Sequence, residues 1–229
     1  MALADDVRNL GARTQAALTR VLDYYYQSRD IWELMKSDVR AGRTFTSTNT
    51  AKGTVADQTA IISAMPAYIE AYLTPATFQQ LVTVFEAFFF DLLARWLTAN
   101  PGSLYRRQVE LETVLSADRD AVLQGVIGRE LNDVKYRRVA EWVEYLRKLV
   151  KVTVVTDDEA AQLAEVKASR DILVHSQGVV NATYTAKAGD RARYAVGDIL
   201  ELPEPYFRAS SDLIEKVIAD VTAAVAAKA

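Results

Sequence analysis

Apolar residues recur every three or four positions along most of the chain, and proline and glycine are concentrated between these stretches. This spacing is typical of amphipathic α-helices, because it places the apolar side chains on one face. The expected fold class is therefore all-α. The helices are predicted over about residues 4–40, 54–69, 74–98, 104–115, 118–131, 135–151, 157–176 and 206–226.

Local signals suggest where the helices in the first half begin. Thr54 followed by Asp57 resembles a capping box, which would start the second helix. Pro66 is expected to kink that helix. Thr74 and Pro75 form a suitable N-cap and first-turn pair, which predicts that a separate helix begins there.

The second half carries a clearer pair of signals around one helix. Thr156 and Glu159 have the spacing of a capping box, and Gly178 is placed to end the helix in the left-handed conformation. The pattern then changes over 179–202, where valine, threonine, tyrosine and glycine are frequent. This stretch predicts a short hairpin or an ordered loop before the last helix.

The helix at 74–98 is the most apolar in the chain and is expected to form the centre of the core. We expect the helix at 157–176 to pack against it and against the last helix, because these carry the strongest apolar faces. The aromatic residues at helical spacing around Trp142 also predict core packing, so no cofactor is assigned to them.

Composition narrows the classes of protein. No run of about 18 apolar residues appears and the first residues lack the pattern of a secretory signal, so we expect a cytoplasmic protein with no membrane segment. The chain has no cysteine and one histidine, which excludes disulfides, thiolate nucleophiles and most histidine-built metal centres. We therefore expect no metal and no cofactor.

The net charge of −3 does not give the molecule the overall basic field of a nonspecific nucleic-acid-binding protein. The sequence still allows RNA binding through a local basic patch. Solvated helix faces, with Glu141 and Glu144 between the basic residues, are the preferred interpretation of most of its candidates. These candidates are Arg106, Arg107, Lys135, Arg137, Arg138, Arg147, Lys148 and Lys151.

The residues most suited to chemistry are Arg170, Asp171 and His175. Asp171 and His175 are four residues apart and should stack on one helix face, whereas Arg170 lies about 140° round the helix from His175. A carboxylate beside an imidazole fixes its tautomer and favours its protonated form. The guanidinium offers a planar fork of donors to a phosphate. The residues expected to line the same site are Ser169, Gly178, Asn181 and Tyr184.

This segment has Arg170, four intervening residues and His175, with a polar residue directly after the arginine and Gly178 soon after the histidine. The arrangement resembles the R-x4-6-H signature of the HEPN-domain family. Its context adds to the resemblance, because the motif lies near the end of a capped helix and an apolar helix carrying Glu86 precedes it. The resemblance covers about residues 75–225.

The resemblance implies a HEPN-like helical domain over 74–229, with an N-terminal helical extension over 1–73 packed on it. It also implies a metal-independent endoribonuclease in which Arg170, Asp171 and His175 are catalytic. One histidine cannot serve as both acid and base, so a homodimer with a composite site is expected. The substrate would be RNA, and the protein would act as a toxin or phage-defence effector. A further partner would be an antitoxin or regulatory protein.

Two competing hypotheses account for the same residues. A noncatalytic HEPN module that dimerises and binds a nucleotide or partner is the main alternative, and an accidental motif in a helical adaptor is the third possibility. His175 would then be a cap that compensates the helix dipole, with Arg170 and Asp171 in surface pairs. Asn181 and Tyr184 are equally well interpreted as a turn residue and a strand aromatic.

Overall fold

The computed structural model describes residues 2–49, 52–104, 107–109 and 118–229, and these are mostly helical, which confirms the all-α prediction. The α-helices are α1 (Ala2–Arg40), α2 (Gln58–Tyr68), α3 (Thr74–Ala99), α5 (Arg119–Lys135), α6 (Val139–Val150), α7 (Asp157–His175), α8 (Ala182–Ala188) and α9 (Glu204–Ala226). The remaining elements are the strands β1 (Thr46–Asn49) and β2 (Thr54–Asp57), the π-helix η1 (Ile69–Leu73), and the 3₁₀ turns η2 (Pro101–Leu104) and η3 (Gly189–Arg191).

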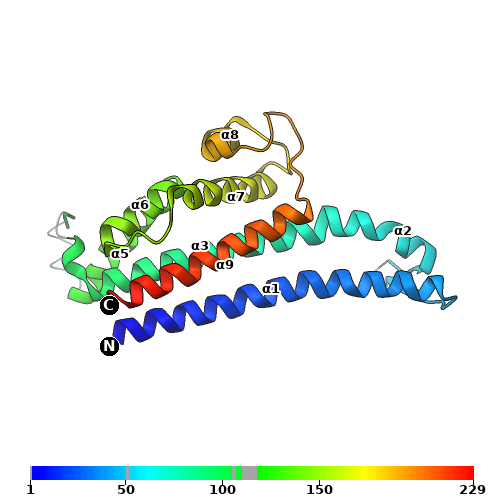
Figure 1. Ribbon diagram of the computed structural model, residues 1–229, viewed down its shortest axis with the longest axis horizontal. Helices are drawn as coiled ribbons and strands as arrows, with labels where there is room; N and C mark the ends of the chain where they lie inside the picture. The colour runs from blue at the N-terminus through cyan, green and yellow to red at the C-terminus, as the bar shows by residue number, and fades with distance from the viewer. Residues whose placement is uncertain (1, 50–51, 105–106, 110–117) are drawn as a thin grey trace.

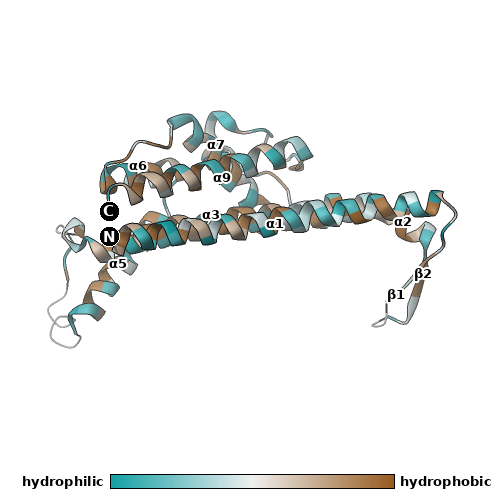
Figure 2. Ribbon diagram, turned by 60° about the horizontal axis from the view of Figure 1, so that its bottom comes forward, coloured by the Kyte–Doolittle hydropathy of each residue, from teal (hydrophilic) through white to brown (hydrophobic). Residues whose placement is uncertain are grey.

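The molecule is an elongated helical bundle (Figure 1). Helix α1 runs antiparallel to α3 and α9 and packs against both, and α7 packs against α3 and α9 as the sequence predicted. The two termini lie together at one end of the bundle. The antiparallel β1–β2 hairpin projects to one side of the bundle near α2, at the opposite end (Figure 2).

The core is centred on α3, as its sequence predicted. One continuous cluster of buried apolar side chains joins α3 to α1, α6, α7 and α9. Tyr25 of α1, for example, is stacked on Phe207 of α9 with ring centroids 4.2 Å apart. Trp142 is fully buried in the same core, as expected for a packing residue. Within the described residues, no helix is both long and apolar enough to cross a membrane.

Helix α1 contributes buried residues to this core from Val7 as far as Tyr25. Val7, Leu10 and Leu18 are buried in the same cluster as the residues of α3. Gly11 lets α1 approach α9 closely, because a Cβ atom there would lie 2.5 Å from Cγ2 of Thr222. The predicted division into an extension over 1–73 and a domain over 74–229 stays a prediction, and the shared core shows that α1 packs as part of the bundle.

The structure corrects both predicted helix starts in the first half. Thr54 and Asp57 belong to strand β2, and the helix begins only at Gln58, where the Asp57 carboxylate accepts a hydrogen bond from the Ala60 N–H (2.9 Å). Asp57 is therefore the N-cap and not the N3 residue of a capping box. Thr54 is held by pairing with strand β1, which the local pattern did not reveal.

Thr74 is likewise not an N-cap, because Leu73 and Thr74 both have helical backbone angles and α2 continues through η1 into α3. Pro75 lacks an N–H, and in an α-helix its ring would clash with the carbonyl four residues earlier. The π-helical segment η1 directly before it widens the helix, which lets the chain pass this proline without a break.

Two other predictions have mixed outcomes. The predicted helix at 104–115 lies mostly outside the described residues, whereas α5 begins at Arg119 with the Asp118 carboxylate as N-cap. The stretch 179–202 forms an ordered loop and not a hairpin: a single bridge joins Val179 to Ile199, and the short helix α8 lies between them. Helix α8 was missed because the local β-like composition is overridden by an N-cap, the Asn181 side chain, which accepts from the Tyr184 N–H (3.0 Å).

Candidate functional site

Capping fixes both ends of α7, the helix that carries Arg170 and His175. The Thr156 hydroxyl accepts from the Glu159 N–H (3.1 Å) and the Glu159 carboxylate accepts from the Thr156 N–H (2.8 Å), so the predicted capping box is present. Lys216 of α9 donates to the same carboxylate (2.7 Å). These hydrogen bonds lower the pKa of Glu159 to about 2. At the other end Ser176 is the C-cap, and positive φ angles follow at Gln177 (+50°) and at Gly178 (+83°), the residue predicted to end the helix.

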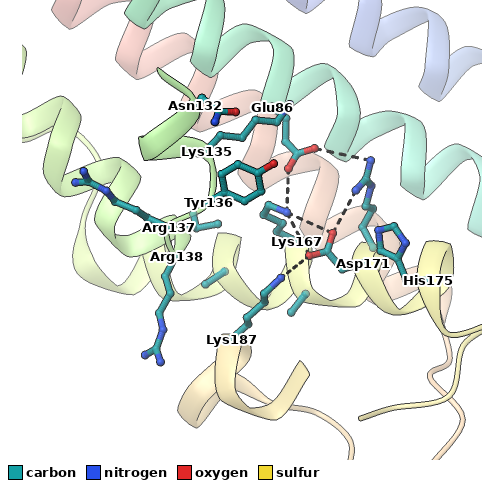
Figure 3. A pocket seen from close by; sticks show the side chains of 14 residues that line it. Glu86, Asn132, Lys135, Tyr136, Arg137, Arg138, Lys167, Asp171, His175 and Lys187 are labelled. Carbon is teal, nitrogen blue, oxygen red and sulfur yellow. Dashed lines mark hydrogen bonds and ion pairs between the residues drawn. The ribbon is translucent and has the colours of Figure 1, made fainter. Parts of the chain in front are cut away.

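A cleft of about 600 Å³ lies along the outer side of α7 (Figure 3). Its walls come from α3, the junction of α5 and α6, α7 and α8. Arg170, Asp171 and His175 all line it, so the fold brings the three predicted catalytic residues into one cavity. The cleft is strongly basic, with two acidic lining residues against six basic ones: Lys135, Arg137, Arg138, Lys167, Arg170 and Lys187.

Ion pairs organise the floor of this cleft. Lys167 bridges two carboxylates, Glu86 of α3 (3.1 Å) and Asp171 (3.2 Å). Arg170 also contacts both, with Nη1 3.2 Å from Asp171 and Nη2 3.9 Å from Glu86. Lys187 of α8 completes the network at 3.0 Å from Asp171. Because all of these side chains except Lys187 are mostly buried, dissolved salt screens their attraction less than it screens exposed pairs.

Asp171 does not play the part that its spacing predicted. Within the described residues no hydrogen bond joins it to His175, whose side chain is exposed. The carboxylate is instead surrounded by Lys167, Arg170 and Lys187. Burial acts to raise the pKa of Asp171, but the charges and hydrogen bonds of Lys167 and Lys187 outweigh it and lower that pKa. Three cations attract a carboxylate more strongly than one imidazole does, which accounts for the correction.

The four residues expected to line the site do not line this cleft. Ser169 precedes Arg170 by one position, about 100° round the helix, and therefore faces the bundle interior, where it is fully buried. Asn181 caps α8 and donates to the Ser176 hydroxyl (3.1 Å). Gly178 lies beyond the helix end, and Tyr184 is a buried residue of α8 itself.

Ser169 and Tyr184 instead belong to a cluster around the buried carboxylate of Glu165. This carboxylate accepts from the Ser169 hydroxyl (2.7 Å), the Tyr184 hydroxyl (2.8 Å) and Nε of Arg193 (3.0 Å) on one oxygen, and from the Tyr206 hydroxyl (2.7 Å) on the other. Burial raises the pKa of both tyrosines. The cluster joins α7, α8, the following loop and α9, and so supports the cleft from behind.

The basic patch considered from the sequence is divided by the fold. Lys135, Arg137 and Arg138 line the cleft. Arg107, Arg147 and Lys148 instead pair with carboxylates near them: Arg107 with Glu130 and Asp133, Arg147 with Asp157, and Lys148 with Glu144. Arg106 lies outside the described residues, and Lys151 ends α6 in the left-handed conformation.

The lining residues that sequence reasoning missed include Tyr136, Lys167 and Lys187. Lys167 had a usable signal, because it lies one turn before Asp171 on the same helix and could form an i,i+4 pair with it. Lys187 had none, since it reaches Asp171 only through the path of the loop that carries α8. Glu86 was noted only as part of the family resemblance, and its contact with Lys167 gives it a structural role.

No cluster of three or more histidine, aspartate or glutamate side chains in the described part of the chain is arranged to hold a metal ion. Comparison of the chain with protein-family models, curated proteins and solved structures finds no match. Function must therefore be argued from the cleft itself.

Proposed function

We propose that the protein is a metal-independent endoribonuclease of the HEPN type, which cleaves RNA in the cleft along α7. The observation that carries the proposal is the position of Arg170 and His175 in one basic cleft, although the protein as a whole is acidic. A phosphodiester backbone is the ligand that such a local positive field attracts.

The chemistry needs few groups, because RNA supplies its own nucleophile. A base removes the 2′-OH proton, the 2′ oxygen attacks the adjacent phosphorus, and an acid protonates the departing 5′ oxygen. The products are a 2′,3′-cyclic phosphate and a 5′-OH. His175 is exposed and so accessible to substrate, and the Arg170 guanidinium is suited to stabilise the charge of the pentacovalent transition state.

The proposed active site is composite. Each chain has one histidine, whereas the reaction uses both a base and an acid. A homodimer in which two copies of α7 face each other would supply His175 twice. We extend the proposal to a toxin or phage-defence effector that acts in the cytoplasm and is controlled by an antitoxin or regulatory protein.

The test is RNA cleavage by the purified full-length chain in EDTA. The expected result is cleavage to cyclic phosphate ends, no cleavage where the target 2′-OH is replaced by 2′-H, and no cleavage by His175→Ala. Arg208→Ala is a matched control, since this exposed arginine on α9 pairs with Glu204 and does not line the cleft. Full activity of His175→Ala would place the active site elsewhere.

A second function, a noncatalytic HEPN module that dimerises and binds a nucleotide or partner, is favoured by two observations. Arg170 is already paired with Asp171 and, at longer range, with Glu86, and no carboxylate orients His175 among the described residues. Such a module would bind RNA or nucleotides without cleaving them. Absence of cleavage on every RNA tested, with binding retained, would support it over the nuclease.

A further inference from the structure

Tyr136 presents an unusual aromatic ring to the cleft. It caps the end of α5, where its backbone N–H donates to the Asn132 carbonyl (3.4 Å). The residue is 84% exposed, the highest value among the exposed large hydrophobic residues described. Within the described residues the ring stacks on no other aromatic side chain, so its faces are open to a ligand.

Three basic residues next to Tyr136 in the chain have no ion-pair partner among the described residues. Lys135, Arg137 and Arg138 are exposed, line the same cleft and form no ion pair with any residue that the structure describes. Lys167, Arg170 and Lys187, in contrast, are held by Glu86 and Asp171. The cleft thus has one part around Asp171 in which the positive charges are paired with carboxylates. In its other part, around Tyr136, the positive charges have no carboxylate partner among the described residues.

These two parts are displaced along the cleft. Figure 3 shows Arg137 and Arg138 at one end, His175 at the other, and Tyr136 and Lys167 between them. A ligand that reached both ends would be an extended chain with several negative charges. An open aromatic ring next to such charges further suits a ligand with alternating phosphates and flat bases.

We propose that Tyr136, Arg137 and Arg138 form a subsite for an unpaired nucleotide of single-stranded RNA, away from the phosphate cleaved near His175. The inference rests on the proposed nuclease function and adds its substrate class. The base of this nucleotide stacks on Tyr136, and its flanking phosphates contact the two guanidinium groups. Bases within a duplex are already stacked on one another, so the subsite selects unpaired segments.

The test measures RNA affinity in a full-length His175→Ala background, which prevents cleavage of the probe. Fluorescence anisotropy with a labelled single-stranded RNA gives the dissociation constant. Tyr136→Ala should weaken binding by about 5- to 150-fold, the range for the loss of one base stacked on an aromatic ring. Tyr136→Phe, which keeps the ring, should restore most of the affinity.

Two further comparisons separate stacking from general attraction. Tyr72→Ala removes another highly exposed tyrosine (69%) that does not line the cleft, and should leave the affinity unchanged. Arg137→Ala with Arg138→Ala should reduce the slope of log affinity against log salt by about 0.7 for each phosphate that is no longer neutralised. With duplex RNA, Tyr136→Ala should have no effect.

The subsite is overturned if Tyr136→Ala binds single-stranded RNA as tightly as its parent, or if it weakens duplex binding equally. These results are independent of the nuclease proposal, which is measured by cleavage with the His175-containing protein. Binding that depends on Tyr136 without any cleavage would reject the nuclease and keep the subsite. If Tyr136→Ala changed neither cleavage nor binding, the subsite would be rejected and the nuclease kept.

Discussion

The hydroxyl of Tyr206 on α9 donates a 2.7 Å hydrogen bond to the carboxylate of Glu165 on α7. The ring of Tyr206 at the same time lies under the guanidinium of Arg193, whose central carbon is 3.4 Å from the ring centroid. Glu165 and Tyr206 therefore join the helix that carries Arg170 and His175 to the last helix and to the loop between them. The stability of this junction is testable apart from any activity.

Glu165→Gln should lower the free energy of unfolding by about 2 kcal/mol, because the amide cannot accept from every donor that the carboxylate satisfies. The cost is smaller than for a fully buried ion pair, since the Arg193 side chain is 24% exposed and can turn to solvent. Urea unfolding of the variant and of wild type measures this difference in the free energy of unfolding. Glu201→Gln, an exposed change in the same loop, should stay within about 0.5 kcal/mol of wild type. Equal effects of the two variants would contradict this account.

Acid should weaken α7 through Glu159. Its pKa is lowered to about 2 in the folded protein, so its contribution is present above its ordinary value of 4.5 and is lost as the pH falls from there towards 2. Glu159→Gln should cost on the order of 1 kcal/mol at pH 7, the usual scale for a cap. The difference between the variant and wild type should shrink below pH 4.5 in urea titrations. A constant difference down to pH 2 would refute the linkage.

Arg170→Ala should reduce the single-turnover rate of RNA cleavage by roughly a hundredfold or more, the scale for one lost donor to developing charge. The cleavage rate of Arg170→Lys should fall between those of Arg170→Ala and wild type, because lysine keeps the charge and loses the planar fork of donors. The Arg208→Ala control should match wild type. If Arg170→Ala raised only the dissociation constant and left the rate at saturation intact, Arg170 would bind substrate without stabilising the transition state.

Asp171→Asn should be milder in cleavage than Arg170→Ala, because it keeps the shape and removes only the charge. Its structural effect should appear in α8, which Lys187 ties to Asp171. Amide hydrogen exchange over 182–188 should therefore become faster. Asp190→Asn, an exposed change just beyond α8, is the control. Unchanged exchange in Asp171→Asn would mean that the Lys187 contact does not hold α8 in place.

A homodimer should appear at micromolar concentration, with twice the chain mass of 25.4 kDa in sedimentation equilibrium. Because the proposed composite site takes His175 from both chains, an excess of the His175→Ala chain should inhibit wild-type activity by forming mixed dimers. The Arg208→Ala chain should not. A strictly monomeric mass would count against both the dimer and the nuclease mechanism.

The sequence was sufficient for features set by neighbouring residues. The helical period of α3, the capping box of Thr156 and Glu159, and the left-handed Gly178 were all predicted. Each depends on groups within a few positions along the chain, where side chain and backbone interact in the same way in most proteins. The failures at Thr54 and Thr74 came where a strand partner and a π-helical segment overrode the local signal.

By itself the sequence also determined that Arg170, Asp171 and His175 would lie close together near the end of one helix. Only the tertiary structure decided what surrounds them. Asp171 contacts Lys187, sixteen residues away, and Lys167 contacts Glu86 on another helix, so the carboxylate expected to orient His175 serves a wider ion-pair network. Periodicity gives the face of a helix but not the rotation of its neighbours, and that rotation, fixed by core packing, sets which charges meet in the cleft.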